Sequence, residues 1–396
     1  MTGRGGRGTG PARRTRRDRP DTAARDDTAG TVGTDHAGGS GSTAGTDHAG
    51  GSGSTAGTDH AGGSGSTAGT DHAGAPGGYL AVDSGGSGLR VAVGTVARGV
   101  LAERRSGEPV RTGERGIDPE HLMGQLVPMV RALTEESGVG RLETVVVGAT
   151  GLATLGDALR AELPAAVGRE FEADTLALAA DAVTAYAGAL GPRPGAVVAA
   201  GTGLIALGTD LTGWRRADGW GHLLGDCGGG AWIGRAGLEA ALRAFDGRAG
   251  GSTALLACAE REFGPMPGLP GLLYPRTDRP AVLASFAPRV AECAADDQVA
   301  AGILRSAARA MAESAAAVCP AGGEPRVAFT GGLFKMGDVL VGPLAEELAR
   351  LVPGAERVPA AGDPLLGSVR IASELVTGSL TLPCDDALLT VTSVRG

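Results

Sequence analysis

Residues 196–235 read AVVAAGTGLIALGTDLTGWRRADGWGHLLGDCGGGAWIGR, and the other motifs of the chain are organised around this stretch. Its first apolar run, 196–200, ends in Gly201-Thr202-Gly203, and a second apolar run follows at once. The pattern predicts two strands joined by a tight turn. Glycines on both sides of a hydroxyl residue let backbone N–H groups approach an anion closely, although an ordinary hairpin turn has the same pattern.

Further along the same stretch, residues 219–226 read GWGHLLGD and place polar and aromatic groups among three glycines. Three more glycines, 228–230, then precede a helical pattern over 231–245. A glycine-rich helix N-terminus exposes unpaired N–H groups next to the positive end of the helix dipole. We therefore expect this place to favour an anionic ligand.

Residues 1–78 contain almost no large apolar side chains, so they are not expected to join a packed domain. Residues 4–25 carry eight arginines, and TDHAGGSGSTAG then repeats with a period of twelve, which places Asp-His pairs at His36, His48, His60 and His72. One interpretation is a metal-binding tract behind a nucleic-acid-binding arm. The favoured one is a disordered, duplicated tail, or a start codon assigned too far upstream, because so much glycine and serine opposes ordering.

The charge and the cysteines narrow the class of protein. The net charge of −8 lies entirely in residues 79–396, since eight aspartates balance the eight arginines of the tail, and an acidic core argues against a nucleic-acid partner. No apolar run reaches the length of a membrane span, and no secretory signal is visible. Five cysteines in no ligand spacing do not suggest a disulfide framework, so a reducing cytoplasm is the expected compartment.

A second glycine-rich turn opens the core. The apolar run 79–82 ends in Asp83, and Ser84-Gly85-Gly86-Ser87-Gly88 then leads into the run 89–96. A further strand over 100–104 would complete a meander. A plain Gly/Ser hairpin is an equal alternative for this turn alone. However, residues 201–203 form a second turn of the same kind, with glycines around a hydroxyl residue between two apolar runs.

Strands and helices alternate after the meander. A helix is expected from Asp118-Pro119, then a strand over 144–148, a turn over 149–151 and a helix to about residue 166. A strand over 176–180 ends at Asp181, before a helix over 182–190. This alternation indicates an α/β domain. Asp181 stands where ligands bind in such folds, but it could equally be the N-cap of the helix after it.

The second half repeats the alternation. A strand over 327–330 leads into Gly331-Gly332, a helix follows over 339–351, and a last helix spans 365–376, with an appended strand or loose end behind it. The chain has a single lysine, Lys335, which lacks the spacing that a Walker-type phosphate loop demands. No dinucleotide-binding G-x-G-x-x-G pattern is followed by a ribose-binding acid. If the protein binds a nucleotide, its site is therefore neither a Walker-type loop nor a dinucleotide-binding fold.

Together these motifs resemble the actin, sugar-kinase and Hsp70 superfamily, and within it the BadF/BadG/BcrA/BcrD ATPase family, which includes N-acetylglucosamine kinase. The resemblance spans about residues 79–376. The first phosphate motif of that family matches residues 83–90, the second matches 201–203, and the adenosine motif matches 331–334. The family's GWGHLLGDEGS stretch is found at residues 219–229.

The resemblance implies an α/β protein of two ribonuclease-H-like (actin-like ATPase) domains with a cleft between them, preceded by a disordered tail. The implied boundaries are 1–78 for the tail, 79–182 and 183–376 for the two domains, and 377–396 for a C-terminal extension. The helix over 365–376 is expected to pack back on the N-terminal domain.

The resemblance also implies an ATP-dependent sugar kinase that uses Mg²⁺ and acts on N-acetylglucosamine or a relative. Asp181 matches the catalytic base. The implied nucleotide-binding residues are Asp83, Gly85, Gly86, Ser87, Arg90, Gly201, Thr202, Gly203, Gly331 and Gly332, with Asp83 also holding the metal. The implied sugar-binding residues are Thr150, Gly151, Asp181, Gly221, His222 and Asp226. No membrane partner is implied, and a homodimer stays an open option.

Two departures from the family leave the sugar open. Cys227-Gly228-Gly229 stands where the family has Glu-Gly-Ser, and residues 108–113 lack the family's sugar-binding asparagine. One alternative is the ATPase that activates 2-hydroxyacyl-CoA dehydratases through an iron–sulfur cluster, which is disfavoured because Cys227 has no cysteine nearby. Another is a non-catalytic nucleotide sensor on the same fold.

Overall fold

The computed structural model describes residues 77–86, 88–113 and 115–395. Two groups of expectations therefore lie outside the described residues. The first concerns residues 1–76 of the expected tail, with its histidine repeats, and the second concerns Ser87 in the first glycine-rich turn.

The first sheet has the strand order β13-β7-β6-β1-β2-β3. Its antiparallel meander, β1 (Gly78–Gly85), β2 (Gly88–Thr95) and β3 (Gly99–Ser106), confirms the three strands expected there. Strands β6 (Leu142–Ala149) and β7 (Thr175–Ala180) run parallel to β1. The chain's last strand, β13 (Leu389–Ser393), pairs antiparallel with β7, so the C-terminal segment is an appended strand.

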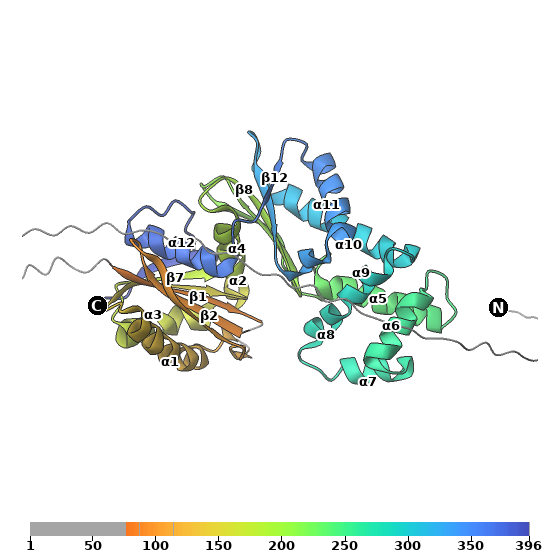
Figure 1. Ribbon diagram of the computed structural model, residues 1–396, viewed down its shortest axis with the longest axis horizontal. Coiled ribbons are helices and arrows are strands. Elements are labelled where there is room, and N and C mark those ends of the chain that lie inside the picture. Colours follow the sequence, from red (N-terminus) through yellow and green to blue (C-terminus); the bar gives the residue numbers. More distant parts are fainter. Residues whose placement is uncertain (1–76, 87, 114, 396) are drawn as a thin grey trace, which may run out of the picture. The chain divides into compact units, whose positions relative to one another are not determined.

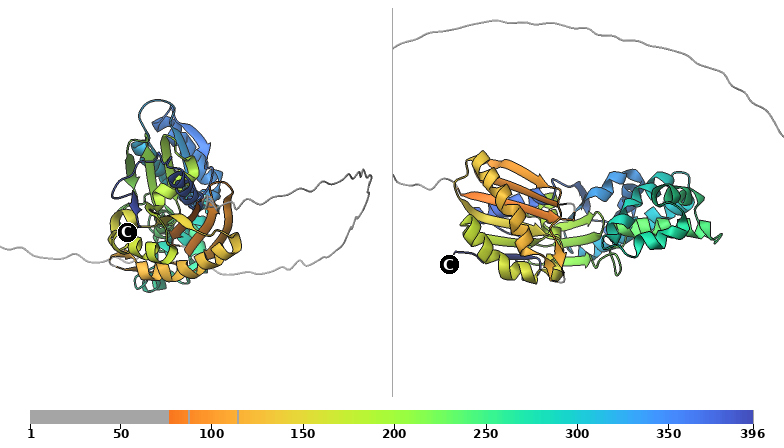
Figure 2. Two further views of the ribbon diagram at one scale, coloured as in Figure 1. Left: turned by 90° about the vertical axis from the view of Figure 1, so that its left-hand side faces the viewer. Right: turned by 90° about the horizontal axis from the view of Figure 1, so that it is seen from below.

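Helices cover both faces of this sheet (Figure 1). On one face lie α1 (Pro119–Ser137) and α3 (Asp157–Phe171), and on the other lie α4 (Asp181–Leu190) and α12 (Pro364–Val376), as the view from below also shows (Figure 2). As predicted, Asp118 caps α1, because its side chain accepts the backbone N–H groups of Glu120 and His121.

The prediction of a single helix after residue 151 is wrong, because two helices follow that residue. The structure has a short α2 (Leu152–Leu155), a break at Gly156, and then α3. Gly156 is both the C-cap of α2 and the N-cap of α3, and a side chain there would meet the Leu152 carbonyl oxygen at 2.3 Å.

The second sheet has the order β10-β9-β8-β11-β12. The hairpin of β8 (Gly195–Ala200) and β9 (Leu204–Thr209) confirms the strand-turn-strand prediction, and β10 (Trp214–Asp218) extends it. Strands β11 (Arg326–Thr330) and β12 (Glu356–Pro359) run parallel to β8. The turns after β8 and β11 therefore leave the sheet at the same edge. A separate two-stranded ribbon joins β4 (Thr112–Gly113) and β5 (Gly116–Ile117).

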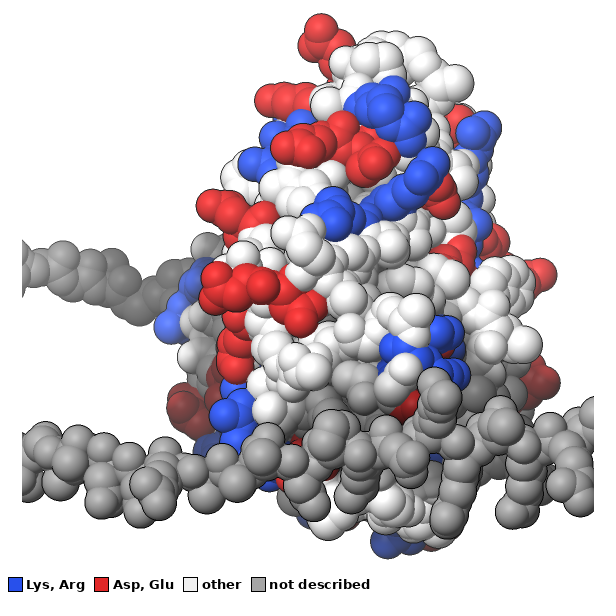
Figure 3. Space-filling model, turned by 90° about the vertical axis from the view of Figure 1, so that its right-hand side faces the viewer, with Lys and Arg blue, Asp and Glu red and all other residues white. Residues whose placement is uncertain are grey.

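Most of the remaining elements are helices around the second sheet, and only the first and the last of them are predicted by the sequence. They are α5 (Gly230–Phe245), α6 (Thr253–Phe263), α7 (Leu269–Leu273), α8 (Arg279–Ser285), α9 (Ala287–Cys293), α10 (Gln298–Val318) and α11 (Asp338–Leu351), with short 3₁₀ turns η1 (Met266–Gly268) and η2 (Gly332–Met336). On the face drawn in Figure 3, acidic and basic side chains are interspersed and do not gather by sign. None of the described helices is long and apolar enough to cross a membrane.

Helix α4 contacts strands of both sheets. All its residues after Asp181 are buried, and its Tyr186 hydroxyl donates to the Arg193 carbonyl oxygen at 2.6 Å. The Tyr186 ring also packs edge-on against Trp214, with ring centroids 5.3 Å apart. The helix that begins at Asp181 is thus fixed in the core of the protein.

Candidate active site

Three parallel strands of the first sheet end side by side. The register aligns Ser84 of β1 with Ala149 of β6, and Ala149 with Ala180 of β7. The residues that follow these three positions, Thr150 and Asp181 among them, therefore leave the sheet at one edge. Carboxyl ends of parallel strands are the usual ligand-binding edge of an α/β sheet.

Asp83 and Arg90 face each other across the first hairpin, because they are register partners of β1 and β2. The Arg90 guanidinium donates to Oδ2 of Asp83 through Nε at 3.0 Å and through Nη2 at 2.6 Å. Burial raises the pKa of Asp83, and the pairing with Arg90 opposes this shift only in part. The other carboxylate oxygen, Oδ1, is not used in these two bonds.

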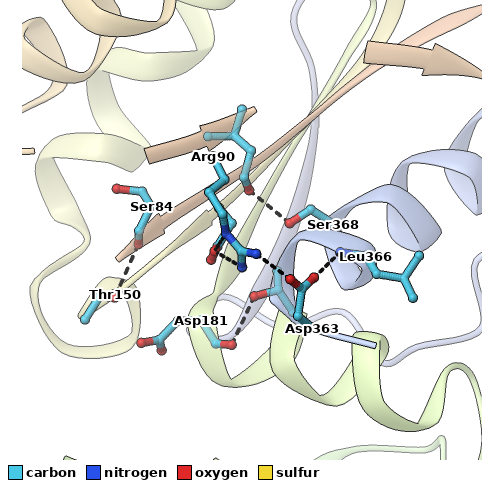
Figure 4. Close-up of polar contacts among 10 residues, drawn as sticks. Ser84, Arg90, Thr150, Asp181, Asp363, Leu366 and Ser368 are labelled. Atoms are coloured by element: carbon cyan, nitrogen blue, oxygen red, sulfur yellow. Dashed lines mark hydrogen bonds and ion pairs between the residues drawn. The ribbon is translucent and has the colours of Figure 1, made fainter. Parts of the chain in front are cut away.

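Arg90 also reaches the other end of the chain, where its Nη1 donates to Oδ2 of Asp363 (Figure 4). Asp363 is the N-cap of α12 and accepts the Leu366 N–H at 3.1 Å. Burial acts to raise the pKa of Asp363, but these hydrogen bonds outweigh it and lower the pKa. Close by, Ser368 of the same helix donates to the Val82 carbonyl oxygen at 2.9 Å. The last helix is thereby fastened to β1 and β2, the two strands on either side of the first glycine-rich turn.

Asp181 is the first residue of α4, and the N-cap is Ala180. The N-cap interpretation of Asp181 is therefore wrong, because the chain enters the helix one residue earlier than that role requires. Oδ1 of Asp181 accepts the N–H of Ala182, its own neighbour, at 2.9 Å. Burial raises the pKa of Asp181, hydrogen bonds from Thr150 and Ala182 oppose it, and the nearby Asp83 charge adds to the rise.

Thr150 and Gly151 form the turn after β6. The Thr150 N–H and hydroxyl both donate to the Ser84 carbonyl oxygen, at 3.1 and 3.3 Å, which ties this turn to the first hairpin (Figure 4). Gly151 has φ 77°, a left-handed value that suits glycine. Both residues are exposed.

In the second sheet, the turn Gly201-Thr202-Gly203 packs on the N-terminus of α5. The N–H groups of Gly230 and Ala231 donate to the carbonyl oxygens of Gly201 and Thr202, at 2.9 and 2.8 Å. The expectation that this helix end offers unpaired donors is therefore wrong for these two groups. In the described part of the chain, the Thr202 and Gly203 N–H groups have no hydrogen-bond partner. The carbonyl groups of the turn point to α5, and its own N–H groups at Thr202 and Gly203 are the ones available to an anion.

A cavity of about 760 Å³ lies beside this turn. Gly201, Thr202 and Gly230 line one part of it, and Gly332 and Leu333 of η2 line another. Helices α8 and α9 supply a further wall, which includes Ser285 and Glu292. The size lies within the range of about 300–1,000 Å³ that small-molecule sites occupy.

Gly331 positions η2 beside the cavity. Its φ is 110°, and a side chain at this position would meet the Ala200 carbonyl oxygen at 2.2 Å. The rings of Phe329 and Phe334, on either side of it, stack with centroids 5.3 Å apart. The glycine thus allows β11 to lead directly into the cavity wall.

The loop 219–226 closes on itself through two aspartates. Oδ1 of Asp226 accepts the Gly221 N–H at 2.9 Å, while Asp218 accepts the N–H groups of Asp226 and Cys227, at 2.6 and 2.8 Å. Burial raises the pKa of Asp226, and the Asp218 charge adds to the rise. His222 is partly exposed near Asp226 and lines a second cavity with Leu223.

Two residues of this arrangement escaped the sequence analysis. Asp218 has φ 60°, a left-handed value that is rare for a residue with a side chain. No local sequence pattern predicts this backbone conformation. Asp363 lies just before the helix predicted over 365–376, and no role was predicted for it. Its contact with Arg90, 273 residues away, has no sequence signal.

Comparison with known proteins identifies the family of this chain and agrees with its fold. Residues 80–369 match the BadF/BadG/BcrA/BcrD ATPase family. The chain belongs to that family. Its two mixed sheets are the actin-like ATPase domains that the resemblance implied, and the predicted fold class is confirmed. ATP binding follows at the level of the family.

The chain is similar to a named kinase over a short segment, and to two solved structures over most of its length. The N-acetylmuramic acid/N-acetylglucosamine kinase of Clostridium acetobutylicum is 45% identical over 69 residues, which make up 17% of this chain and 22% of that protein. The structure of a candidate N-acetylglucosamine kinase from Chromobacterium violaceum has a TM-score of 0.59 and 25% identity, over 74% of this chain and 98% of that one. A second candidate, from Porphyromonas gingivalis, has a TM-score of 0.55 at 16% identity, over 74% of this chain and 97% of that one.

Proposed function

We propose that the protein transfers the γ-phosphate of ATP to a hydroxyl group of an amino sugar, N-acetylglucosamine or a relative. The observation that carries the proposal is Asp181, a carboxylate with a raised pKa where β7 meets α4. A general base works best when its pKa lies near the operating pH, and burial moves Asp181 in that direction. Its role is to accept the proton of the attacking hydroxyl.

The second sheet provides the groups suited to the nucleotide. The unpaired N–H groups of Thr202 and Gly203 would bind phosphate oxygens, and the cavity lined by Gly332 and Leu333 would hold the base and ribose. In the first sheet, Arg90 is already engaged by Asp83 and Asp363. We therefore assign Arg90 to the positioning of Asp83 and not to direct phosphate binding.

Asp83 suits Mg²⁺ as a single protein ligand. Its Oδ2 is held by Arg90, which leaves Oδ1 for the metal or for a metal-bound water. No group of three metal-ligating side chains occurs in the described ranges, and Mg²⁺ often binds through one or two carboxylates with several waters. When bound, the ion would neutralise charge on the transferred phosphoryl group.

The loop 219–226 is the proposed sugar-binding element, together with Thr150 and Gly151. The Asp226 carboxylate, whose Oδ1 accepts the Gly221 N–H, is the proposed acceptor of a sugar hydroxyl. The Clostridium acetobutylicum relative acts on amino sugars by its name, and this supports the same substrate class here.

A sugar panel tests the proposal. The purified protein, ATP and Mg²⁺ are incubated with N-acetylglucosamine, N-acetylmuramic acid, glucosamine and glucose, and ADP release is followed. We expect an amino sugar to stimulate ADP release well above the rate with ATP alone. Sugar-independent ATP hydrolysis would favour the alternative, an ATPase that acts as an activator or sensor, and would reject the kinase proposal.

A further inference from the structure

Two of the five cysteines lie in contact although the sequence separates them by 35 residues. Cys258 is the middle residue of α6, Cys293 is the last residue of α9, and their Sγ atoms are 3.8 Å apart. All five cysteines are described and free, and in this part of the chain only these two have neighbouring sulfurs. A disulfide bond is about 2.05 Å long, so the two sulfurs would have to approach each other by a little under about 2 Å to bond.

The surroundings of the two sulfurs differ. Arg261 donates through Nη2 to Sγ of Cys258 at 3.0 Å, which places a permanent positive charge beside that sulfur. Burial raises the pKa of Cys293 to about 11, with the neighbouring Cys258 adding to the shift, so Cys293 stays a thiol at neutral pH. Cys258 is 8% exposed and Cys293 is partly exposed. Cys293 is therefore the more solvent-exposed member of the pair.

We propose that Cys258 and Cys293 form a reversible dithiol–disulfide site whose oxidant is a peroxide. Cys258 attacks the peroxide, its sulfur takes one oxygen to become a sulfenic acid, and water leaves. The Cys293 sulfur then attacks the sulfenic sulfur, an S–S bond forms, and the oxygen departs as a second water with the Cys293 proton. Both thiols are oxidised by two electrons in all, and the peroxide is reduced. A small dithiol reverses the reaction by exchange.

The Cys258–Cys293 pair lies next to the wall of the cavity beside the 201–203 turn. Helix α9 contributes Pro288, Ala291 and Glu292 to the cavity wall, and Cys293 is the next residue. A disulfide would tie this end of α9 to α6, the helix behind it. Oxidation would therefore change ligand binding in the cavity from outside, a step that rests on the proposed nucleotide function.

Peptide mapping of the full-length protein tests the site itself. The reduced protein is exposed to hydrogen peroxide, remaining thiols are alkylated, and disulfides are mapped by mass spectrometry before and after dithiothreitol. We expect a mass loss of about 2 Da and a Cys258–Cys293 link that dithiothreitol removes. Cys384→Ser, at the exposed cysteine, is the matched control and should leave the link intact. Oxidation of Cys384 without any Cys258–Cys293 link would overturn the proposal.

Two variants guard against a folding artefact. Cys293→Ser changes the partly exposed member and should abolish the link even if Cys258→Ser, in the buried position, fails to fold. Arg261→Gln should slow link formation several-fold, because it removes the charge beside Cys258. An unchanged rate in Arg261→Gln would refute the role given to that charge.

ADP binding separates the site from the proposed function. Oxidation should change ADP affinity at least two-fold in the wild type and leave it unchanged in Cys293→Ser. Equal affinities of oxidised and reduced wild type would refute the coupling to the cavity. A reduced protein that binds no ADP would instead count against the proposed nucleotide site, while the mapped disulfide would still stand.

Discussion

The carboxylate of Asp218 accepts the backbone N–H of Asp226 at 2.6 Å, and both residues have left-handed backbones, with φ 60° and 54°. A backbone of this kind in a residue with a side chain costs about 1–3 kcal/mol and persists only where other contacts hold it. The hydrogen bonds of Asp218 to Asp226 and Cys227 are such contacts. Asp218 thus positions the loop that carries the proposed sugar ligand.

Replacement of Asp218 by Ala and by Gly should separate strain from hydrogen bonding. Asp218→Ala removes both hydrogen bonds and keeps the strained backbone, so we expect a loss of about 1–3 kcal/mol in the free energy of unfolding. Asp218→Gly removes the same bonds but accepts the positive φ, and should lose less. Urea unfolding measures both. In the sugar assay, both variants should raise KM more than they lower kcat; an unchanged KM would show that the loop does not hold the sugar.

Arg90→Ala should destabilise the protein by about 1–3 kcal/mol, because it leaves Asp83, whose side chain is 15% exposed, without its counter-charge. The matched control is Arg326→Ala, which breaks an exposed pair with Glu356 on the second sheet. Exposed pairs contribute about 0–1 kcal/mol, so that loss should be small. Equal losses in urea unfolding would mean that the Arg90 contacts to Asp83 and Asp363 contribute no more than a surface pair.

Asp181→Asn should raise stability while it lowers turnover. The pKa of Asp181 in the folded protein lies above its unfolded value, so folding takes up a proton and stability falls as pH rises from about 3.8 through the folded pKa. At neutral pH the buried charge is therefore destabilising, and the amide should raise the melting temperature. Loss of the base should lower kcat by about 10²–10⁴.

The pH profile provides the check on this assignment. If Asp181 is the base, kcat of the wild type should fall on the acid side at a pH above 3.8, in line with the raised pKa. Binding of ATP should be nearly unchanged in Asp181→Asn. Turnover within a few-fold of the wild type would return the search for a base to Asp83 and Asp226.

Gly331→Ala tests the close approach beside the cavity. The added methyl would meet the Ala200 carbonyl oxygen at 2.2 Å in a backbone of φ 110°, so we expect a loss of about 1–3 kcal/mol and weaker ADP binding. Gly332→Ala is the matched control for stability, because a methyl there has nothing within 4 Å. Similar melting temperatures for the two variants would remove the steric argument.

The sequence predicted the parts of the fold that depend on neighbours in the chain. The hairpin at 201–203, the strand that ends at Asp181 and the helix capped by Asp118 all follow from local periodicity and turn residues. The α5 N-terminus was misjudged, because whether Gly230 and Ala231 have free N–H groups depends on which carbonyls pack against them. Asp218 and the Arg90–Asp363 contact depend in the same way on tertiary structure, which no local pattern records.

The pairing of β13 with β7 has a consequence for synthesis of the chain. The sheet that carries Asp83 and Asp181 receives its edge strand from residues 389–393 and the covering helix α12 from residues 364–376. Domains tend to fold in order as they leave the ribosome, but this sheet lacks both elements until residues 364–393 have been made. Until then the outer edge of β7 has no strand paired with it, and the sheet face under α12 has no covering helix.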